Sequence, residues 1–340
     1  YMAKNFSWPF GFPSHSNPGA PGVILEGGEL GYSLSTAYGA VLDNPDLIAA
    51  CVVGDGEAET GPLATAWHAN KLIDPARNGA VLPILHVNGY KISGPTFYGR
   101  MRDEDLASLF VGYGYEPIFV VHETSLYADM QAALAEAAVR IAKIQERARS
   151  GEQRVYPYRF PMIILRTPKG WTGIKNLHGE KLEGNYLSHQ VVAKDAKTNA
   201  EDLQALEEWL RSYKFQELFS RETGFSTLIQ SLLPEPVLRM GDTPHARTGA
   251  LGYKPLILPD EEDFCENATT PGTMGSSSMR RAGLYLEKVF RLNAEAKNFR
   301  LFSPDETYSN KLDDVFRTTT RALVLPRLPT DKDMSSDGRV

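Results

Sequence analysis

The sequence lacks the features that mark several large classes of protein. Its 340 residues include two cysteines, Cys51 and Cys265, so no disulfide framework is expected and a reducing cytoplasm is the expected compartment. No apolar run is long enough to cross a membrane, and no signal peptide opens the chain. With 36 Lys and Arg against 42 Asp and Glu, the formal charge of −6 leaves no basic surplus for general nucleic-acid binding.

The first half of the chain alternates short apolar runs with helical patterns. Continuous apolar runs are typical of strands buried on both faces. They occupy residues 47–53, 81–87, 118–121 and 161–166. Helical patterns cover residues 30–42 and 62–73, and the clearest has one apolar face made of Leu126, Met130, Leu134, Ala137, Ile141 and Ile144. The alternation predicts an α/β fold, with a parallel sheet and helices on both faces.

The second half follows a different pattern. A Gly-rich loop at 169–190 precedes a helical segment at 201–213, and Pro and Gly punctuate residues 234–273. A new unit then begins, with a helix at 279–293, a strand at 299–303, a helix after Asn310, a strand at 322–325 and a polar tail at 330–340. We predict a first domain at 1–240, a linker at 241–278 and the incomplete start of a second α/β domain at 279–340. Because the chain opens at Tyr1 as if within a domain, we expect it to be part of a longer polypeptide.

Polar residues follow two of the predicted strands where each strand ends. Gly54-Asp55-Gly56-Glu57 follows the first strand, and Asn88 follows the second, 33 positions after Asp55. The carboxyl ends of parallel strands form a ligand crevice, so these side chains are expected to converge. A carboxylate, an amide oxygen and a backbone carbonyl, for which Tyr90 is the natural candidate, suit Mg²⁺ and leave positions for diphosphate oxygens. Either motif alone is also compatible with an ordinary turn.

This Gly-Asp-Gly motif, followed by an asparagine about thirty residues later, resembles the signature of thiamine-diphosphate (ThDP) enzymes. Further stretches resemble phosphoketolases in particular. They are Glu26–Leu34, Gly54–Pro62, Asn88–Ser93, Pro168–Gly173, Ser188–Gln190, Arg239–Asp242 with Pro244–Ala246, and Ser303–Asn310. The resemblance covers nearly the whole chain, from about Phe6 to Arg327.

The resemblance implies an activity and an assembly. Phosphoketolases cleave xylulose 5-phosphate, and often fructose 6-phosphate, with inorganic phosphate to give acetyl phosphate and glyceraldehyde 3-phosphate or erythrose 4-phosphate. The implied cofactors are ThDP and Mg²⁺. The implied assembly is a homodimer or larger homo-oligomer, because such enzymes hold the cofactor between the diphosphate domain of one subunit and the pyrimidine domain of another.

Two other functions remain open at this point. One is a transketolase-type two-carbon transferase, and the other is a non-catalytic fragment that needs a partner to supply the pyrimidine domain. A nucleotide-binding Rossmann domain is disfavoured, because no Gly-x-Gly-x-x-Gly with a suitable acidic residue follows a strand.

The resemblance also implies roles for individual residues around the cofactor. Gly28, Glu29 and Leu30 match the loop that contacts ThDP, and Gly56 and Glu57 match diphosphate contacts. Asp55, Asn88 and the Tyr90 carbonyl match the Mg²⁺ ligands.

The implied catalytic residues lie elsewhere in the chain. Lys169 and His189, with Gln190 beside them, match acid–base or charge-stabilising groups next to the cofactor, and His15 matches another active-site histidine. Ser309 matches a substrate- or phosphate-binding residue of the second domain, although it could instead cap the helix after it. Lys169 could instead be a solvated loop lysine, and we expect His86 to be packed within its strand.

The sequence departs from the family pattern in two respects. Leu25 stands where many bacterial members carry a histidine. In addition, the family's Gly-Pro-Gly-His element and the pyrimidine-domain glutamate that activates the cofactor are not in this chain. We therefore expect this chain alone to bind ThDP weakly and to turn over poorly.

Overall fold

The fold is taken from a computed structural model of the chain, which describes all residues except 1, 10, 123–124, 152–157, 240 and 244–254. Two of the family-like stretches are affected. Met240, within Arg239–Asp242, and the whole of Pro244–Ala246 lie outside the described residues.

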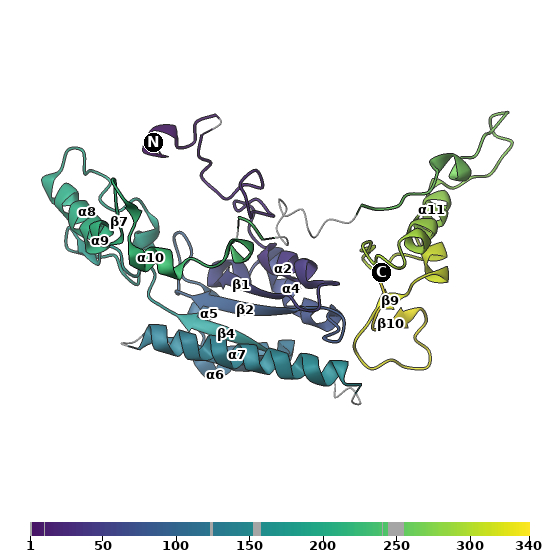
Figure 1. Cartoon of the computed structure of the whole chain (residues 1–340), viewed down its shortest axis with the longest axis horizontal. Coiled ribbons are helices and arrows are strands. Elements are labelled where there is room, and N and C mark those ends of the chain that lie inside the picture. Colours follow the sequence, from purple (N-terminus) through teal and green to yellow (C-terminus); the bar gives the residue numbers. More distant parts are fainter. Residues whose placement is uncertain (1, 10, 123–124, 152–157, 240, 244–254) are drawn as a thin grey trace.

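A four-stranded parallel sheet forms the centre of the first half (Figure 1). Its order is β1-β2-β4-β3, with β1 at Ile48–Gly54, β2 at Ala80–Val87, β3 at Tyr115–Val121 and β4 at Phe160–Arg166. The register places Gly54 beside His86 and Val87 beside Arg166, so β1, β2 and β4 end along one edge. The predicted α/β fold with a parallel sheet is confirmed.

Helices and small hairpins surround this sheet and continue beyond it. The α-helices are α1 (Met2–Asn5), α2 (Ser33–Val41), α3 (Asp55–Ala58), α4 (Gly61–Ala66), α5 (Phe97–Arg100), α6 (Asp103–Tyr113), α7 (Leu126–Arg149), α8 (Ala200–Ser212), α9 (Phe215–Leu218), α10 (Thr227–Leu232) and α11 (Ser278–Leu292). The 3₁₀ helices are η1 (Trp67–Leu72), η2 (Tyr186–His189), η3 (Pro236–Leu238), η5 (Glu261–Phe264) and η6 (Asp313–Arg317). The two-residue strands are β5 (Asn176–Leu177), β6 (Glu180–Lys181), β7 (Phe219–Ser220), β8 (Gly224–Phe225), β9 (Arg321–Ala322) and β10 (Met334–Ser335).

Each face of the sheet has its own hydrophobic core. On one face α2, η1 and α6 bury Leu34, Trp67 and Phe110 completely, with α2 against β1 and β2 and α6 against β3. On the other face α7 buries Ala137 and Ile141 against β3 and β4. Burial of this apolar surface is the main stabilising term for the sheet layers.

Two sequence expectations about burial are corrected. β1 is buried on one face only: Val53 is fully buried, whereas Ile48 and Val52 are 45% and 64% exposed. The reason is that β1 is an edge strand and α7 packs against β3 and β4. Leu134 is 39% exposed, because the buried stripe of α7 runs through Ala133 instead.

The C-terminal unit packs α11 against η6 and pairs β9 with β10 in parallel. Predicted strand 299–303 is wrong. That segment is irregular, although Leu301 N–H donates to Arg339 O at 3.0 Å. The expected helix after Asn310 is the short η6, the strand at 322–325 is the two-residue β9, and the polar tail contributes β10.

One carboxylate connects the two halves of the chain. Asp43, which precedes β1, accepts hydrogen bonds on both oxygens from Arg300 and from Arg339 at 2.9–3.0 Å. The C-terminal unit therefore docks beside the amino end of β1, and Figure 1 places it at the opposite end of the sheet from α8–α10.

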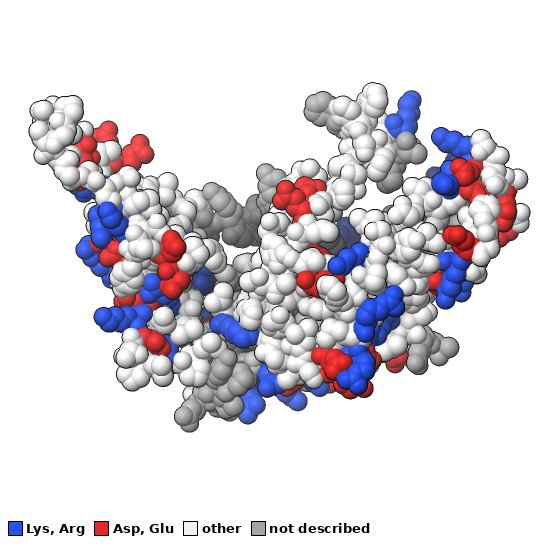
Figure 2. All heavy atoms as spheres, turned by 180° about the vertical axis from the view of Figure 1, so that it is seen from behind, with Lys and Arg blue, Asp and Glu red and all other residues white. Residues whose placement is uncertain are grey.

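The charged side chains do not separate by sign on the face seen in Figure 2, where acidic and basic side chains are interspersed. Within the described residues, no helix combines the length and the apolar character needed to cross a membrane.

Candidate active site

Asp55 is the central polar residue at the carboxyl edge of the sheet. β1 ends at Gly54, Asp55 begins α3, and the Asp55 side chain is 1% exposed. Its Oδ2 accepts hydrogen bonds from Gly89 N–H at 2.7 Å and from Thr96 Oγ1 at 2.8 Å, while Oδ1 accepts from Gly56 N–H at 3.0 Å. The carboxylate thus joins the end of β1 to the loop after β2, as the sequence motif requires.

The loop after β2 brings two further oxygens to this edge. Asn88 Oδ1 accepts a hydrogen bond from Tyr90 N–H at 3.1 Å, and the Tyr90 carbonyl accepts one from Lys169 Nζ at 2.9 Å. Gly89 between them has φ of +89°, a left-handed conformation that costs glycine little. Three oxygen donors of the expected kinds therefore lie on two connected loops.

Lys169 is close enough to this cluster to interact with Asp55. Burial lowers the pKa of Lys169, and the Asp55 carboxylate acts in the opposite direction by favouring the charged ammonium. An ammonium on the Tyr90 carbonyl, in the field of Asp55, indicates that the cluster attracts a cation. Lys169 therefore lies in this cluster instead of extending freely into solvent, and its role toward a cofactor stays a prediction.

The donor set fits a hard divalent cation. Carboxylate, amide and carbonyl oxygens are the ligands that Mg²⁺ accepts, together with phosphate oxygens and water. Among the described residues, no group of three or more His, Cys, Asp or Glu side chains is placed to hold a metal ion. A cation at Asp55 would therefore depend on Asn88, on Tyr90 and on oxygens supplied by a bound diphosphate.

The Glu57 side chain is hydrogen-bonded within the chain, and its contact with a diphosphate stays a prediction. Its Oε1 accepts hydrogen bonds from Gly31 N–H and from Ser33 Oγ, both at 2.9 Å. The side chain therefore ties α3 to the start of α2. This bond holds the end of the loop that carries Gly28, Glu29 and Leu30.

The loop of Gly28, Glu29 and Leu30, which is predicted to contact the cofactor, presents backbone donors. Gly28 N–H and Glu29 N–H both point at the Glu26 carboxylate, with distances of 2.8 and 3.2 Å to Oε2. Leu30 follows with 68% of its surface exposed. Adjacent N–H groups that bind one carboxylate form an arrangement that can bind another anion.

His189 and Gln190 lie beside the loop of Lys169. A Cβ on Gly170 would fall 2.5 Å from the Cβ of Ser188, so the two backbones approach closely and only glycine fits. Gln190 Nε2 donates to the Ile92 carbonyl at 3.5 Å, a weak bond that nevertheless connects η2 to the loop after β2. Both His189 and Gln190 are exposed.

His15 lies on the segment next to the loop of Gly28. Its Nδ1 is 2.9 Å from Ser14 Oγ, and both residues are exposed. The neighbouring Ser16 carbonyl accepts a hydrogen bond from Gly27 N–H at 2.9 Å. The N-terminal segment is thereby attached to the loop that carries Gly28.

Ser309 is not brought to this edge of the sheet. Its hydroxyl donates to the Glu306 carbonyl at 3.1 Å, within a turn of the C-terminal unit. That unit docks beside Asp43, at the amino end of β1, whereas Asp55 follows the carboxyl end. The capping alternative is wrong, because the next helical turn begins only at Asp313. The role of Ser309 toward a substrate or phosphate stays a prediction.

Two cavities adjoin Asn88 and contain residues that the sequence did not single out. One, of about 380 Å³, is lined mainly by apolar side chains and by His86, Asn88, Thr167 and Lys169. The other, of about 400 Å³, is bordered by Tyr90, Arg100, His122 and Arg166. His86 is partly exposed rather than packed, and its Nε2 lies 2.7 Å from Thr167 Oγ1. The pKa of His86 lies below its ordinary value, mainly because of burial and also because of the Lys169 charge, while the Asp55 carboxylate acts in the opposite direction.

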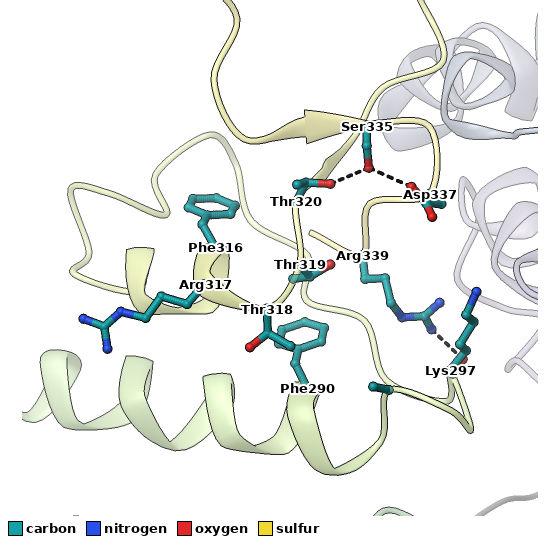
Figure 3. Close-up of a pocket in the computed structure, with 11 residues that line it drawn as sticks. Phe290, Lys297, Phe316, Arg317, Thr318, Thr319, Thr320, Ser335, Asp337 and Arg339 are labelled. Atoms are coloured by element: carbon teal, nitrogen blue, oxygen red, sulfur yellow. Dashed lines mark hydrogen bonds between the residues drawn. The ribbon is translucent and has the colours of Figure 1, made fainter.

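A further cavity, of about 440 Å³, lies in the C-terminal unit (Figure 3). Its polar groups bond to one another: Thr320 Oγ1 to Ser335 Oγ at 2.5 Å, and Ser335 Oγ to Asp337 Oδ1 at 2.9 Å. Arg339, also in its wall, binds Asp43. These groups hold the unit together, so the candidate active site remains the edge around Asp55.

The chain matches two family models. The XFP N-terminal domain matches residues 1–251, and D-xylulose 5-phosphate/D-fructose 6-phosphate phosphoketolase matches residues 280–340. A probable phosphoketolase of Bradyrhizobium diazoefficiens is 50% identical over an alignment of 341 positions, which covers 100% of this chain and 42% of that protein. Probable phosphoketolase 2 of Rhizobium meliloti is 52% identical over an alignment of 342 positions, which covers 100% of this chain and 44% of that protein. The chain thus spans less than half the length of these relatives.

Solved structures similar to this chain include transketolases. Two crystal structures of transketolase mutants from Pichia stipitis have TM-scores of 0.53 and 0.54 at 17% and 18% sequence identity. Each comparison covers 92% of this chain and 44% of the transketolase. At this identity the likeness concerns the fold alone. With both family models and relatives at about half identity in agreement, the chain belongs to the phosphoketolase family.

Proposed function

We propose that the full-length protein is a ThDP- and Mg²⁺-dependent phosphoketolase. It would cleave xylulose 5-phosphate, fructose 6-phosphate or both with inorganic phosphate, giving acetyl phosphate and glyceraldehyde 3-phosphate or erythrose 4-phosphate. The observation that carries the proposal is the buried Asp55 carboxylate, hydrogen-bonded to the loop of Asn88 and Tyr90 with Lys169 beside it. Of the similar transketolase structures, one is a complex with xylulose 5-phosphate and another a complex with fructose 6-phosphate.

One group of site residues would bind the metal ion and an anion. Asp55, Asn88 and the Tyr90 carbonyl would hold Mg²⁺, and the N–H groups of Gly28 and Glu29 would bind an anionic group. When bound, ThDP supplies a carbon nucleophile and, afterwards, an electron sink for the pair released on carbon–carbon cleavage.

The remaining polar groups would handle charge and protons. Lys169 would stabilise negative charge, since its ammonium already lies on a site oxygen. His189 is exposed beside the Lys169 loop, where it can exchange protons with a substrate, and Gln190 can donate a hydrogen bond. His15, on the adjoining N-terminal segment, would be a second proton-transfer group.

The position of Ser309 supports a homodimer. Within one chain Ser309 belongs to the unit docked at the amino end of β1, away from Asp55. If Ser309 contacts the substrate or phosphate, it would do so in the site of a second subunit. The homodimer, the domain boundaries and the cytoplasmic location stay predictions.

The decisive experiment is an acetyl-phosphate assay on the full-length protein. We expect acetyl phosphate to form from xylulose 5-phosphate or fructose 6-phosphate when inorganic phosphate is present and no aldose acceptor is added. Turnover that requires an aldose acceptor and ignores phosphate would instead establish the transketolase-type transferase. Calorimetry of this chain and of the full-length protein with ThDP and Mg²⁺ tests whether the chain alone is a non-catalytic fragment.

Replacing Lys169 with Met tests how the Lys169 ammonium affects the binding of the metal ion and of ThDP. Without ThDP, Lys169→Met should bind Mn²⁺ about two- to fivefold more tightly, because no ammonium remains on the Tyr90 carbonyl near Asp55. ThDP affinity should fall by about 10–150-fold, since a hydrogen bond from a charged group is worth roughly 1.5–3 kcal/mol. Equilibrium dialysis of Mn²⁺ and calorimetry of ThDP measure the two effects.

Lys175→Met is the matched control, because the Lys175 side chain is 71% exposed and 4.0 Å from Glu183. Weaker Mn²⁺ binding by Lys169→Met would contradict this account.

A further inference from the structure

We propose that Thr96 is a positioning residue, whose hydroxyl fixes the orientation in which Asp55 presents its carboxylate to a metal ion. The inference rests on the proposed function, because it requires a cation at Asp55. Thr96 is 1% exposed, and its Oγ1 lies 2.8 Å from Asp55 Oδ2, across 41 positions of sequence. It lies outside the residues to which the sequence resemblance gives a role.

The direction of the hydrogen bond follows from the partners of the hydroxyl. Thr96 Oγ1 accepts a hydrogen bond from Gly99 N–H at 3.0 Å, which occupies one of its lone pairs. A hydroxyl carries a single proton, and the Asp55 carboxylate can only accept. The proton of Thr96 is therefore donated to Asp55 Oδ2.

This bond makes the two oxygens of Asp55 unequal. Among the described residues, Oδ2 receives two donors, the Thr96 hydroxyl and Gly89 N–H at 2.7 Å, whereas Oδ1 receives one, Gly56 N–H at 3.0 Å. Oδ1 is consequently the oxygen with the greater free capacity for a cation. Groups that hold a metal-binding carboxylate in one orientation typically change metal affinity by about 10–100-fold when they are removed.

A neighbouring carboxylate holds the segment that carries Thr96. Glu59 Oε2 accepts hydrogen bonds from Phe97 N–H at 2.6 Å and from Tyr98 N–H at 3.2 Å, and Oε1 pairs with Lys91. Glu59 thus anchors α5 without a hydrogen bond to Asp55. Glu59→Ala is therefore a suitable control, because it removes hydrogen bonds to α5 and keeps the hydroxyl of Thr96 and the carboxylate of Asp55.

The experiment measures Mn²⁺ binding to the full-length protein, using the electron paramagnetic resonance signal of free Mn²⁺, and unfolding by urea. Thr96→Val keeps the shape and removes the hydroxyl, and should weaken Mn²⁺ binding about tenfold. Thr96→Ser keeps the hydroxyl and should stay within about threefold of the wild type. Thr96→Ala and Thr96→Ser differ from each other only by the hydroxyl, so this pair gives the same comparison if Thr96→Val does not fold.

Two further variants make the result decisive. Glu59→Ala should lower the urea midpoint while Mn²⁺ affinity stays within about threefold of the wild type. Equal losses of affinity in Glu59→Ala and Thr96→Val would show that Thr96 merely anchors α5, and would overturn the inference. Wild-type Mn²⁺ affinity in Thr96→Val, with binding lost in Asp55→Asn, would also overturn it while leaving the proposed metal site intact. Undiminished binding in Asp55→Asn would instead overturn the metal site of the proposed function.

Discussion

Asp55→Asn is expected to reduce acetyl-phosphate formation by the full-length protein by about 1000-fold or more, a loss of roughly 4 kcal/mol of transition-state stabilisation. The substitution keeps the shape of the side chain but removes its charge from the site of the proposed cation. It also leaves two donors, Gly89 N–H and the Thr96 hydroxyl, around a group that now has one acceptor oxygen. A buried donor without a partner costs about 1–3 kcal/mol. Calorimetry should detect no ThDP binding at Mg²⁺ concentrations that saturate the wild type.

The matched control for this change is Asp46→Asn. Asp46 lies in the same part of the chain, but its side chain is 91% exposed, and its contact with Arg149 is 3.5 Å long. Exposed pairs of this kind contribute about 0–1 kcal/mol, so activity and ThDP affinity should be unchanged. More than a tenth of wild-type activity in Asp55→Asn would be incompatible with the proposed metal site.

The central strands could be predicted from the sequence because their apolar runs are local signals. β2 is buried along almost its whole length, in agreement with its uninterrupted apolar run. The similar run of β1 is buried on one face only, because burial of the other face depends on what packs there. An apolar run therefore predicts a strand, but its burial depends on its place in the sheet.

Of the helices that the sequence analysis did not predict, α6 is the longest, and the sequence marks both of its ends. α6 begins with Asp103, Glu104 and Asp105, which interact favourably with the positive end of the helix dipole. It ends at Gly114, whose φ of +94° is typical of a helix C-terminus. By contrast, segment 299–303 has strand-like composition but no paired neighbouring strand, and composition cannot supply one.

In the candidate site, too, residues next to a predicted strand could be found from the sequence, whereas a residue defined by a tertiary contact could not. Asp55 and Asn88 could be found from the sequence, because each follows a recognisable strand. Thr96 could not, since its importance depends on a hydroxyl that meets Asp55 only after the chain has folded. Glu57 was placed at the site from its motif, but its bonds to Gly31 and Ser33 became visible only in the structure.

Asp43→Ala is expected to release the C-terminal unit from the sheet. Burial alone would raise the pKa of Asp43, but hydrogen bonds from Arg300 and Arg339 outweigh it, so the pKa lies below its ordinary value of 3.8. Without the carboxylate, the two guanidinium groups would lie close together with no anion between them. We expect the free energy of local opening to fall by about 2 kcal/mol, less than for a fully buried pair because the Asp43 side chain is 29% exposed. Hydrogen exchange of the amides of Leu301 and Val340, both hydrogen-bonded in this unit, measures that opening.

The pH dependence of this effect has a definite sign. A carboxyl group whose pKa is lowered by folding stabilises the folded state above its unfolded pKa, and this stabilisation is lost as the pH falls through the folded pKa. The difference in opening free energy between wild type and Asp43→Ala should therefore be constant from neutral pH down to about pH 4 and should narrow below it. Asp46→Ala, at a neighbouring exposed carboxylate, should leave the exchange of the same amides unchanged. A difference that widens on acidification would mean that Asp43 is not the ionised partner of both arginines, and that other contacts hold the C-terminal unit on the sheet.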